Sequence, residues 1–155
     1  MPPDRPSALG RRSVNYLLDT NHWSHIQRGN PAVLAKLQSL SDDTVLFMPV
    51  VAQAELLAGV ETMAEGRRKQ ELRHLYEDVL QEATEILPIA SRVAERFAAV
   101  FAQLRRAGTP IKTNDMWVGT IALAHHPTVV SSDAHFRCIQ GVRVEDWATP
   151  AQPGS

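Results

Sequence analysis

The sequence predicts an α/β fold of three layers, in which helices cover both faces of a central parallel sheet of four to five strands. Three observations favour this fold. Short apolar runs alternate with longer amphipathic segments, the runs lack a regular polar alternation, and acidic residues follow several of them. Strands of this kind are typical of a sheet buried on both faces, as parallel sheets are.

The first strand is predicted at Val14–Leu18, a short and mostly apolar run. Asn30 and Pro31 begin a helix, because Asn is a favoured N-cap and Pro is favoured at the first helical position. The second strand follows at Val45–Met48. Two helices come next and are separated only by a turn, so we expect them to form a protruding hairpin. They are predicted at Val50–Met63 and Arg67–Ala83.

A brief strand at residues 86–87 precedes a long amphipathic helix, Ile89–Ala107, which Gly108 ends as a C-cap. The last helix begins near Thr113 or Asn114, both suitable N-caps, and runs to residue 125. The last strands are predicted at Val129–Ser132 and Val142–Val144.

A chain of 155 residues favours one domain, which we expect at residues 14–147, between a disordered lead-in (1–13) and a flexible tail (148–155). Hydrophobic residues make up 44% and charged residues 21% of the chain, which excludes fibrous or wholly disordered classes. No apolar run is long enough to span a bilayer or has the form of a signal peptide, so we expect a cytoplasmic protein without membrane contact. The single cysteine, Cys138, excludes a disulfide framework and a cysteine-based zinc site.

The net charge of −1 weighs against a dedicated nucleic-acid-binding domain, although a metal-dependent nuclease does not need a basic surface overall. Two basic runs are candidates for phosphate contacts, with a solvated helix face as the favoured interpretation. They are Arg67, Arg68, Lys69 and Arg73, and Arg105, Arg106 and Lys112. The histidines, among them His135, lack the HExxH or cysteine pattern of a zinc site.

Four acidic residues lie just past predicted strands or near the beginnings of predicted helices: Asp19, Glu55, Asp115 and Asp133. Ligands of parallel sheets bind at the carboxyl ends of the strands, so we expect one cleft to hold all four. Carboxylates brought together out of water repel one another, which raises the pKa of at least one of them or requires a cation. A hard divalent ion, Mg²⁺ or Mn²⁺, is the simplest cation that fits.

Four phrases around these acids, in this order, resemble the motifs of the PIN-domain family, and within it the VapC-type toxins of bacterial toxin-antitoxin pairs. They are Leu17–Asn21, Ala54–Val60, Thr113–Ala122 and Val130–Phe136. The resemblance extends over residues 16–147. It implies a PIN-like domain that acts as an endoribonuclease with Mg²⁺ or Mn²⁺, hydrolysing RNA phosphodiester bonds through Asp19, Glu55, Asp115 and Asp133 as catalytic and metal-binding quartet. It further implies a cognate antitoxin, a homodimer, and Asn21, Asn114 and Ser131 as supporting polar groups.

Two positions depart from the family pattern. Ala52 stands where the family often has Ser or Thr, and Ser131 where it often has Thr. An alternative is therefore a non-catalytic PIN-like module that binds RNA or protein. A phosphatase of another acidic-motif fold is disfavoured, because Asn21 occupies the place of the acid that one such family requires two residues after the first. The sequence leaves open the target RNA, the antitoxin, and whether one metal or two are bound.

Overall fold

The computed structural model describes residues 14–149. The predicted lead-in at 1–13 lies outside the described residues, as does the predicted tail except for its first two residues. Those two, Ala148 and Thr149, donate hydrogen bonds to the carboxylate of Asp146.

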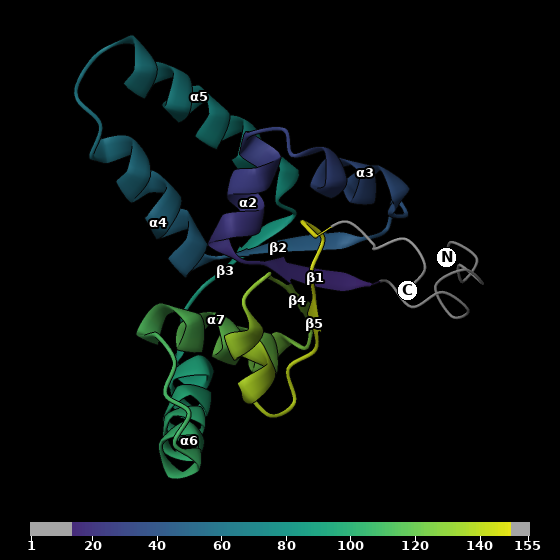
Figure 1. The fold of residues 1–155 in the computed structure, drawn as a ribbon, viewed down its shortest axis with the longest axis vertical. Coiled ribbons are helices and arrows are strands. Elements are labelled where there is room, and N and C mark those ends of the chain that lie inside the picture. Colours follow the sequence, from purple (N-terminus) through teal and green to yellow (C-terminus); the bar gives the residue numbers. More distant parts are fainter. Residues whose placement is uncertain (1–13, 150–155) are drawn as a thin grey trace, which may run out of the picture.

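Five strands and six α-helices make up the described part of the chain, with one short 3₁₀ helix, η1 (Figure 1). The strands are β1 (Asn15–Leu18), β2 (Val45–Pro49), β3 (Glu85–Leu87), β4 (Thr128–Val130) and β5 (Val144–Glu145). The helices are α2 (Thr20–Gln27), α3 (Pro31–Ser39), α4 (Val50–Glu61), α5 (Arg67–Glu82), α6 (Ser91–Ala107), α7 (Thr113–His125) and η1 (Ala134–Cys138).

All five strands are parallel and lie in the order β3-β2-β1-β4-β5. The chain builds the sheet outward from β1 to β3, then crosses back to add β4 and β5 on the other side of β1. The connections therefore diverge between β1 and β4, where Leu18 is paired with Val130. This divergence is the place at which parallel α/β sheets bind their ligands. The predicted α/β fold with a parallel sheet is confirmed.

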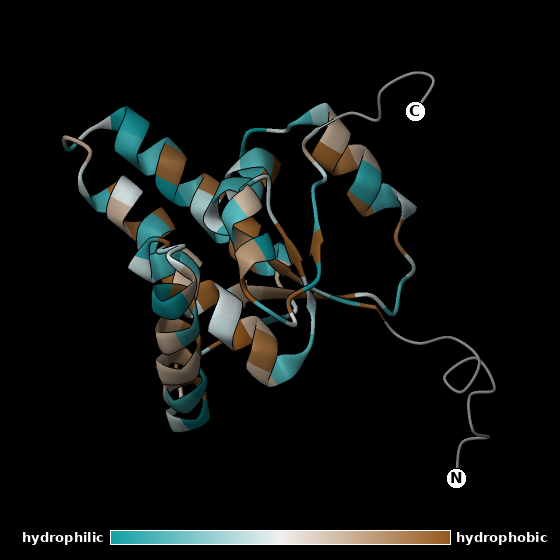
Figure 2. Ribbon diagram, turned by 60° about the horizontal axis from the view of Figure 1, so that its bottom comes forward, coloured by the Kyte–Doolittle hydropathy of each residue, from teal (hydrophilic) through white to brown (hydrophobic). Residues whose placement is uncertain are grey.

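The sheet is buried on both faces because successive residues of a strand point to opposite sides. In β1, Tyr16 and Leu18 belong to one hydrophobic core, which includes residues of α2, α3, α4 and α5. Leu17, between them, belongs to a second core with residues of α6, α7 and η1. Figure 1 shows these two groups of helices on opposite sides of the sheet, and Figure 2 shows that the long helices carry both hydrophobic and hydrophilic residues. The result is the three-layer arrangement that the sequence predicts.

The helical hairpin is formed by α4 and α5, which lie side by side and extend away from the sheet (Figure 1). Gly108 ends α6 in the left-handed conformation, with a φ of 69°, as predicted for a C-cap. The N-cap of α7 is Lys112 rather than Thr113 or Asn114, and its side chain makes no capping hydrogen bond. The 3₁₀ helix η1 was not predicted. Among the described residues, no helix has the length and apolar character needed to cross a membrane.

Candidate active site

Four carboxylates from four separate segments line one cleft at the carboxyl edge of the sheet. Asp19 directly follows β1, and Asp133 lies three residues after β4. Glu55 lies in the second turn of α4, and Asp115 in the first turn of α7. The cleft has a volume of about 430 Å³. The residues that line it are Asp19, Thr20, Asn21, Glu55, Lys112, Thr113, Asn114, Asp115, Val118 and Asp133. All four acids that the sequence singles out thus meet in one place.

Asp19 is only 8% exposed, and one oxygen of its carboxylate contacts His22. Its Oδ1 accepts a hydrogen bond from the backbone N–H of His22 at 2.9 Å, which caps α2, and lies 3.1 Å from Nδ1 of the same residue. The backbone N–H of Trp147 donates to Nε2 of His22. Because Nε2 accepts a hydrogen bond, the imidazole carries its proton on Nδ1 and donates it to Asp19. Both contacts of the Asp19 carboxylate with His22 involve Oδ1, and Asp19 also lines the cleft.

The position of Asp133 is fixed by a compact turn after β4. The hydroxyl of Ser131 accepts a hydrogen bond from the backbone N–H of Asp133 at 2.9 Å. The carboxylate of Asp133 then accepts the backbone N–H of His135 at 2.9 Å and caps η1. Ser131 is 2% exposed, so its role is to shape this turn rather than to contact a substrate. The turn uses the hydroxyl group of residue 131, which Ser supplies here.

Asp115 is an acid of the cleft whose pKa responds to the charges around it. Burial raises the pKa of its carboxyl above the ordinary value of 3.8, and the negative charge of Asp133 raises it further. The cation of Lys112 lowers the pKa, whereas Asp19 and Glu55 again raise it. Asp115 is therefore repelled by the charges of the other three acids, and a bound cation would relieve this repulsion.

Glu55 is the most peripheral of the four acids, because its side chain is exposed. The hydroxyl of Thr20 donates a hydrogen bond to Oε1 of Glu55 at 2.8 Å. This bond links the first turn of α2 to α4 and orients the carboxylate across the cleft. The predicted supporting residues Asn21 and Asn114 line the cleft as well. Ala52, by contrast, is fully buried in the hydrophobic core, so its departure from the family pattern does not alter the lining of the cleft.

Three residues gain an importance that the sequence did not reveal. Lys112 is the one cationic side chain among the described residues that line the cleft. In the sequence, only its place in a basic run indicated a role for Lys112. The structure separates Lys112 from Arg105 of the same run, because Arg105 lines another pocket. His22 and His135 contact Asp19 and Asp133 respectively. Their spacing of three and two residues from these acids is compatible with such contacts, but it is too common to identify them.

The donor atoms of the cleft fit a divalent cation. Ligand atoms of Asp115, Asp133 and His135 all lie within 4.8 Å of one another, and Asp19 and Glu55 line the same cleft as the two aspartates. Carboxylate oxygens are the ligands that Mg²⁺ and Mn²⁺ prefer, and the cleft has room for substrate oxygens beside them. The raised pKa of Asp115 gives this cluster a physical reason to bind a cation.

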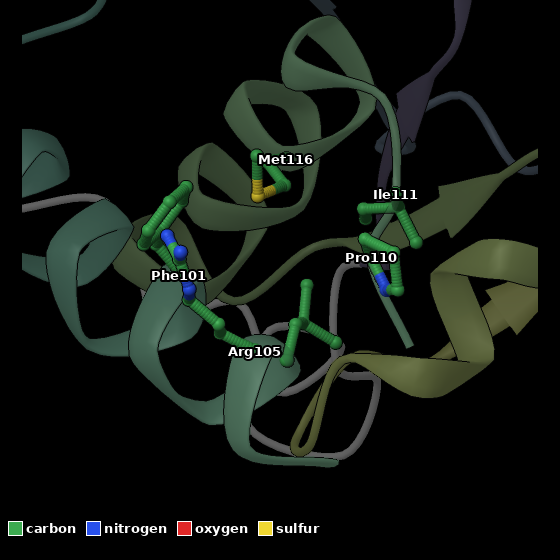
Figure 3. Close-up of a pocket in the computed structure, with 6 residues that line it drawn as sticks. Phe101, Arg105, Pro110, Ile111 and Met116 are labelled. Carbon is green, nitrogen blue, oxygen red and sulfur yellow. The ribbon is translucent and has the colours of Figure 1, made fainter. Parts of the chain in front are cut away.

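A second pocket lies between α6 and the segment that leads into α7, and it has a different character (Figure 3). It has a volume of about 320 Å³ and is lined mainly by apolar side chains, and Arg105 is the one charged residue among the described residues that line it. The guanidinium of Arg105 lies 5.8 Å from the ring centroid of Phe101, which is 43% exposed. Among the residues that the structure describes, those lining this pocket include no carboxylate, in contrast to those lining the acidic cleft.

The fold and the cleft define an α/β protein with an acidic site where the connections of its parallel sheet diverge. Residues 16–141 match the family model of the PIN domain, and the chain belongs to this family. It is 34% identical to plasmid stability protein StbB of Pseudomonas syringae over 76% of this chain and 86% of the relative. It is 30% identical to VapC ribonuclease Y4jK of Sinorhizobium fredii over the same shares of both chains.

The fold is also that of a solved structure, VapBC2 from Rickettsia felis bound to a DNA fragment from their promoter. The TM-score is 0.78 at 20% sequence identity, and the match covers 86% of this chain and 99% of that one. The resemblance that the four sequence motifs indicated is thereby confirmed at the level of family and fold.

Proposed function

We propose that this protein is a metal-dependent endoribonuclease that hydrolyses RNA phosphodiester bonds and is the toxin of a toxin-antitoxin pair. The observation that carries the proposal is the meeting of Asp19, Glu55, Asp115 and Asp133 in one cleft. Membership of the PIN-domain family and similarity to a protein named VapC ribonuclease support the same reaction. A binding module without catalysis would gain nothing from a cluster of mutually repelling carboxylates.

In this proposal, Asp19 and Asp115 are the principal ligands of Mg²⁺ or Mn²⁺, and Asp133 completes the set. When bound, such an ion makes water more acidic and withdraws charge from phosphoryl oxygens. The hydrogen bond from His22 occupies Oδ1 of Asp19, so Oδ2 is the oxygen that would hold the ion. Lys112 is placed to contact a phosphate of the RNA backbone, because it is the cation of the cleft lining among the described residues.

Glu55 acts at the edge of the site, where it is exposed to water. The hydrogen bond from Thr20 fixes one oxygen of its carboxylate and leaves the other to accept a proton. Glu55 therefore either orients and deprotonates the attacking water as a general base or joins Asp133 in holding a second ion. Asn21 and Asn114 supply amide groups that can bind substrate oxygens from the rim.

The test is cleavage of a mixed pool of structured and single-stranded RNA by the purified protein with Mg²⁺ or Mn²⁺, compared with the same reaction in EDTA. We expect Asp19→Asn to abolish cleavage while the circular dichroism spectrum stays unchanged. Asp78→Asn is the matched control, since Asp78 is an exposed acid on α5 outside the cleft. Asp19→Asn protein that still cuts RNA with normal metal dependence would refute the assignment.

The same proposal includes a cognate antitoxin, a homodimer and a cytoplasmic location. The antitoxin is supported by the resemblance to VapC-type toxins and by the fold shared with VapBC2. The cytoplasmic location is proposed because the proposed substrate is RNA. Light scattering of the purified protein at several concentrations measures the oligomeric state, and a constant monomer mass would remove the homodimer from the proposal.

A further inference from the structure

We propose that His135 is a metal ligand of the acidic cleft, and that the site therefore selects a divalent transition ion over Mg²⁺. This inference rests on the proposed function, because it concerns the ion of that same site. His135 belongs to none of the acids or supporting groups that the family motifs single out. His135 is a candidate ligand only because the tertiary structure places its imidazole beside Asp133 and Asp115.

The spacing of the donor atoms is that of a coordination shell. Nδ1 of His135 lies 3.2 Å from Oδ1 of Asp133. Two adjacent ligands of an octahedral ion, each about 2.1 Å from the metal, are about 3 Å apart, and two opposite ligands are about 4.2 Å apart. The donor atoms of Asp115, Asp133 and His135 all lie within 4.8 Å of one another, at most about 0.6 Å beyond the distance between opposite ligands, so rotation of the side chains can bring the three onto one ion.

The backbone that carries His135 is held firmly in place. Its N–H is bound by the carboxylate of Asp133, and the next residue, Phe136, is only 1% exposed. Phe136 of η1 and Ile139, which directly follows η1, pack against α7, where Gly119 lacks the side chain that would keep the two elements apart. Because α7 also carries Asp115, the elements that supply the donor atoms are joined by tight packing. The imidazole itself is exposed, so an ion can reach it from the solvent.

The other histidine near the cleft acids cannot take this role. His22 is fully buried, and both of its ring nitrogens are engaged, Nδ1 with Asp19 and Nε2 with the backbone N–H of Trp147. It therefore positions a ligand without being one. His135, in contrast, has one ring contact, to Asp133, which a bound ion would replace by coordination to both residues.

The chemistry of the donor determines which ion is preferred. Mg²⁺ binds oxygen ligands and keeps several waters, and it gains little from an imidazole. Affinity for a nitrogen-containing site rises along the first-row transition ions from Mn²⁺ onward. A mixed site of carboxylates and one imidazole should therefore bind Mn²⁺ more tightly than Mg²⁺, and it should lose this preference when the nitrogen is removed.

The experiment uses Mn²⁺ as the probe, with the full-length wild-type protein and the variants His135→Gln and His135→Ala. Pulsed electron paramagnetic resonance of bound Mn²⁺ detects a directly coordinated ¹⁴N nucleus. We expect the ¹⁴N modulation in the wild-type protein and its loss in both variants. We also expect the Mn²⁺ affinity to fall about tenfold or more in the variants, while the Mg²⁺ affinity changes by less than about twofold.

His74→Gln is the matched control. His74 is another exposed histidine beside a carboxylate, that of Glu77 on α5, outside the cleft. It should keep both the ¹⁴N modulation and the Mn²⁺ affinity of the wild-type protein. Because His135 is exposed, its substitution should leave the thermal unfolding temperature nearly unchanged.

The outcomes separate this inference from the proposed function. Mn²⁺ bound in the cleft without ¹⁴N modulation, with RNA still cleaved, would overturn the inference and leave the nuclease intact. Mn²⁺ bound with ¹⁴N modulation but no RNA cleavage by any metal-loaded form would overturn the nuclease and leave His135 as a ligand. A wild-type protein that binds neither ion would overturn both.

Discussion

Gly119 in α7 offers a sharp test of how the site is held together. A Cβ atom added at this position would lie 2.4 Å from Cδ1 of Ile139, and 3.9 Å from the ring of Phe136. Favourable carbon–carbon contacts begin at about 3.5 Å, so the overlap with Ile139 is about 1.1 Å. Ile139 is 1% exposed, so its side chain must shift among packed neighbours. Gly119→Ala should therefore force the side chain of Ile139 out of its present position beside α7.

Two opposing contributions set how far Gly119→Ala changes the free energy of unfolding. Replacing glycine by alanine within a helix stabilises it by about 1 kcal/mol, whereas overpacking a core costs about 1–3 kcal/mol. We expect Gly119→Ala to lower the free energy of unfolding by up to about 2 kcal/mol. For a chain of this size, each kcal/mol corresponds to a fall of about 2–4 °C in the unfolding temperature. Urea unfolding followed by circular dichroism measures the change.

Ile139→Val makes the test specific, because it removes Cδ1, the very atom that the added methyl group would strike. Alone it should cost about 0.5–1.5 kcal/mol. In the double variant the clash is absent, so we expect a favourable coupling of about 1 kcal/mol or more, above the 0.3–0.5 kcal/mol scatter of independent sites. Gly59→Ala in α4 is the control, since its added Cβ meets nothing within 4 Å and should stabilise the protein. Additive effects at 119 and 139 would refute the reasoning.

Three further predictions concern single side chains. Asp115→Asn should stabilise the protein in EDTA at neutral pH. Burial and nearby carboxylates raise the pKa of Asp115 above 3.8 in the folded state. Between 3.8 and the raised pKa, the folded protein therefore binds more protons than the unfolded protein. The free energy of unfolding then falls as the pH rises through this range. Thermal unfolding against pH measures this, and an equal pH slope in the Asn variant would contradict it. His22→Ala should destabilise the protein by about 1–3 kcal/mol in urea unfolding, and His22→Asn by less, because an amide can still donate to Asp19; equal losses would contradict this. Asn30→Ala should cost about 0.5–2 kcal/mol in the same assay, through the lost cap on the N–H of Val33, and an unchanged unfolding midpoint would exclude that contribution.

Much of the fold is predictable from local pattern. The strand before Asp19 and the helix that begins at Pro31 are indicated by an apolar run and by a cap sequence, and both occur within one or two residues of the predicted bounds. Such features depend on neighbours in the chain, which the sequence presents directly. The ends of β4 and β5 are less predictable, because a strand ends where its partner ends. β5 has only two residues, and it pairs with Val129 and Val130.

Part of the candidate site can likewise be predicted from the sequence, and part depends on tertiary packing. That Asp19 and Asp133 lie at one edge follows from sequence, because both come just after parallel strands and the carboxyl ends of such strands meet. Neither the position of Lys112 in the cleft nor that of His135 beside Asp115 follows from sequence. Both depend on how α7 and η1 pack, and that packing is set by contacts such as the one between Gly119 and Ile139.

The sequence by itself therefore determines the class of fold, the order of its elements and the acids of the cleft. Only the tertiary structure decides which polar side chains from distant parts of the chain join those acids: Thr20 beside Glu55, and His135 beside Asp115. The reason is physical. Periodicity and capping act over a few residues and are written in the local pattern, whereas the orientation of a side chain in a cleft depends on distances of a few tenths of an ångström between elements far apart in the chain.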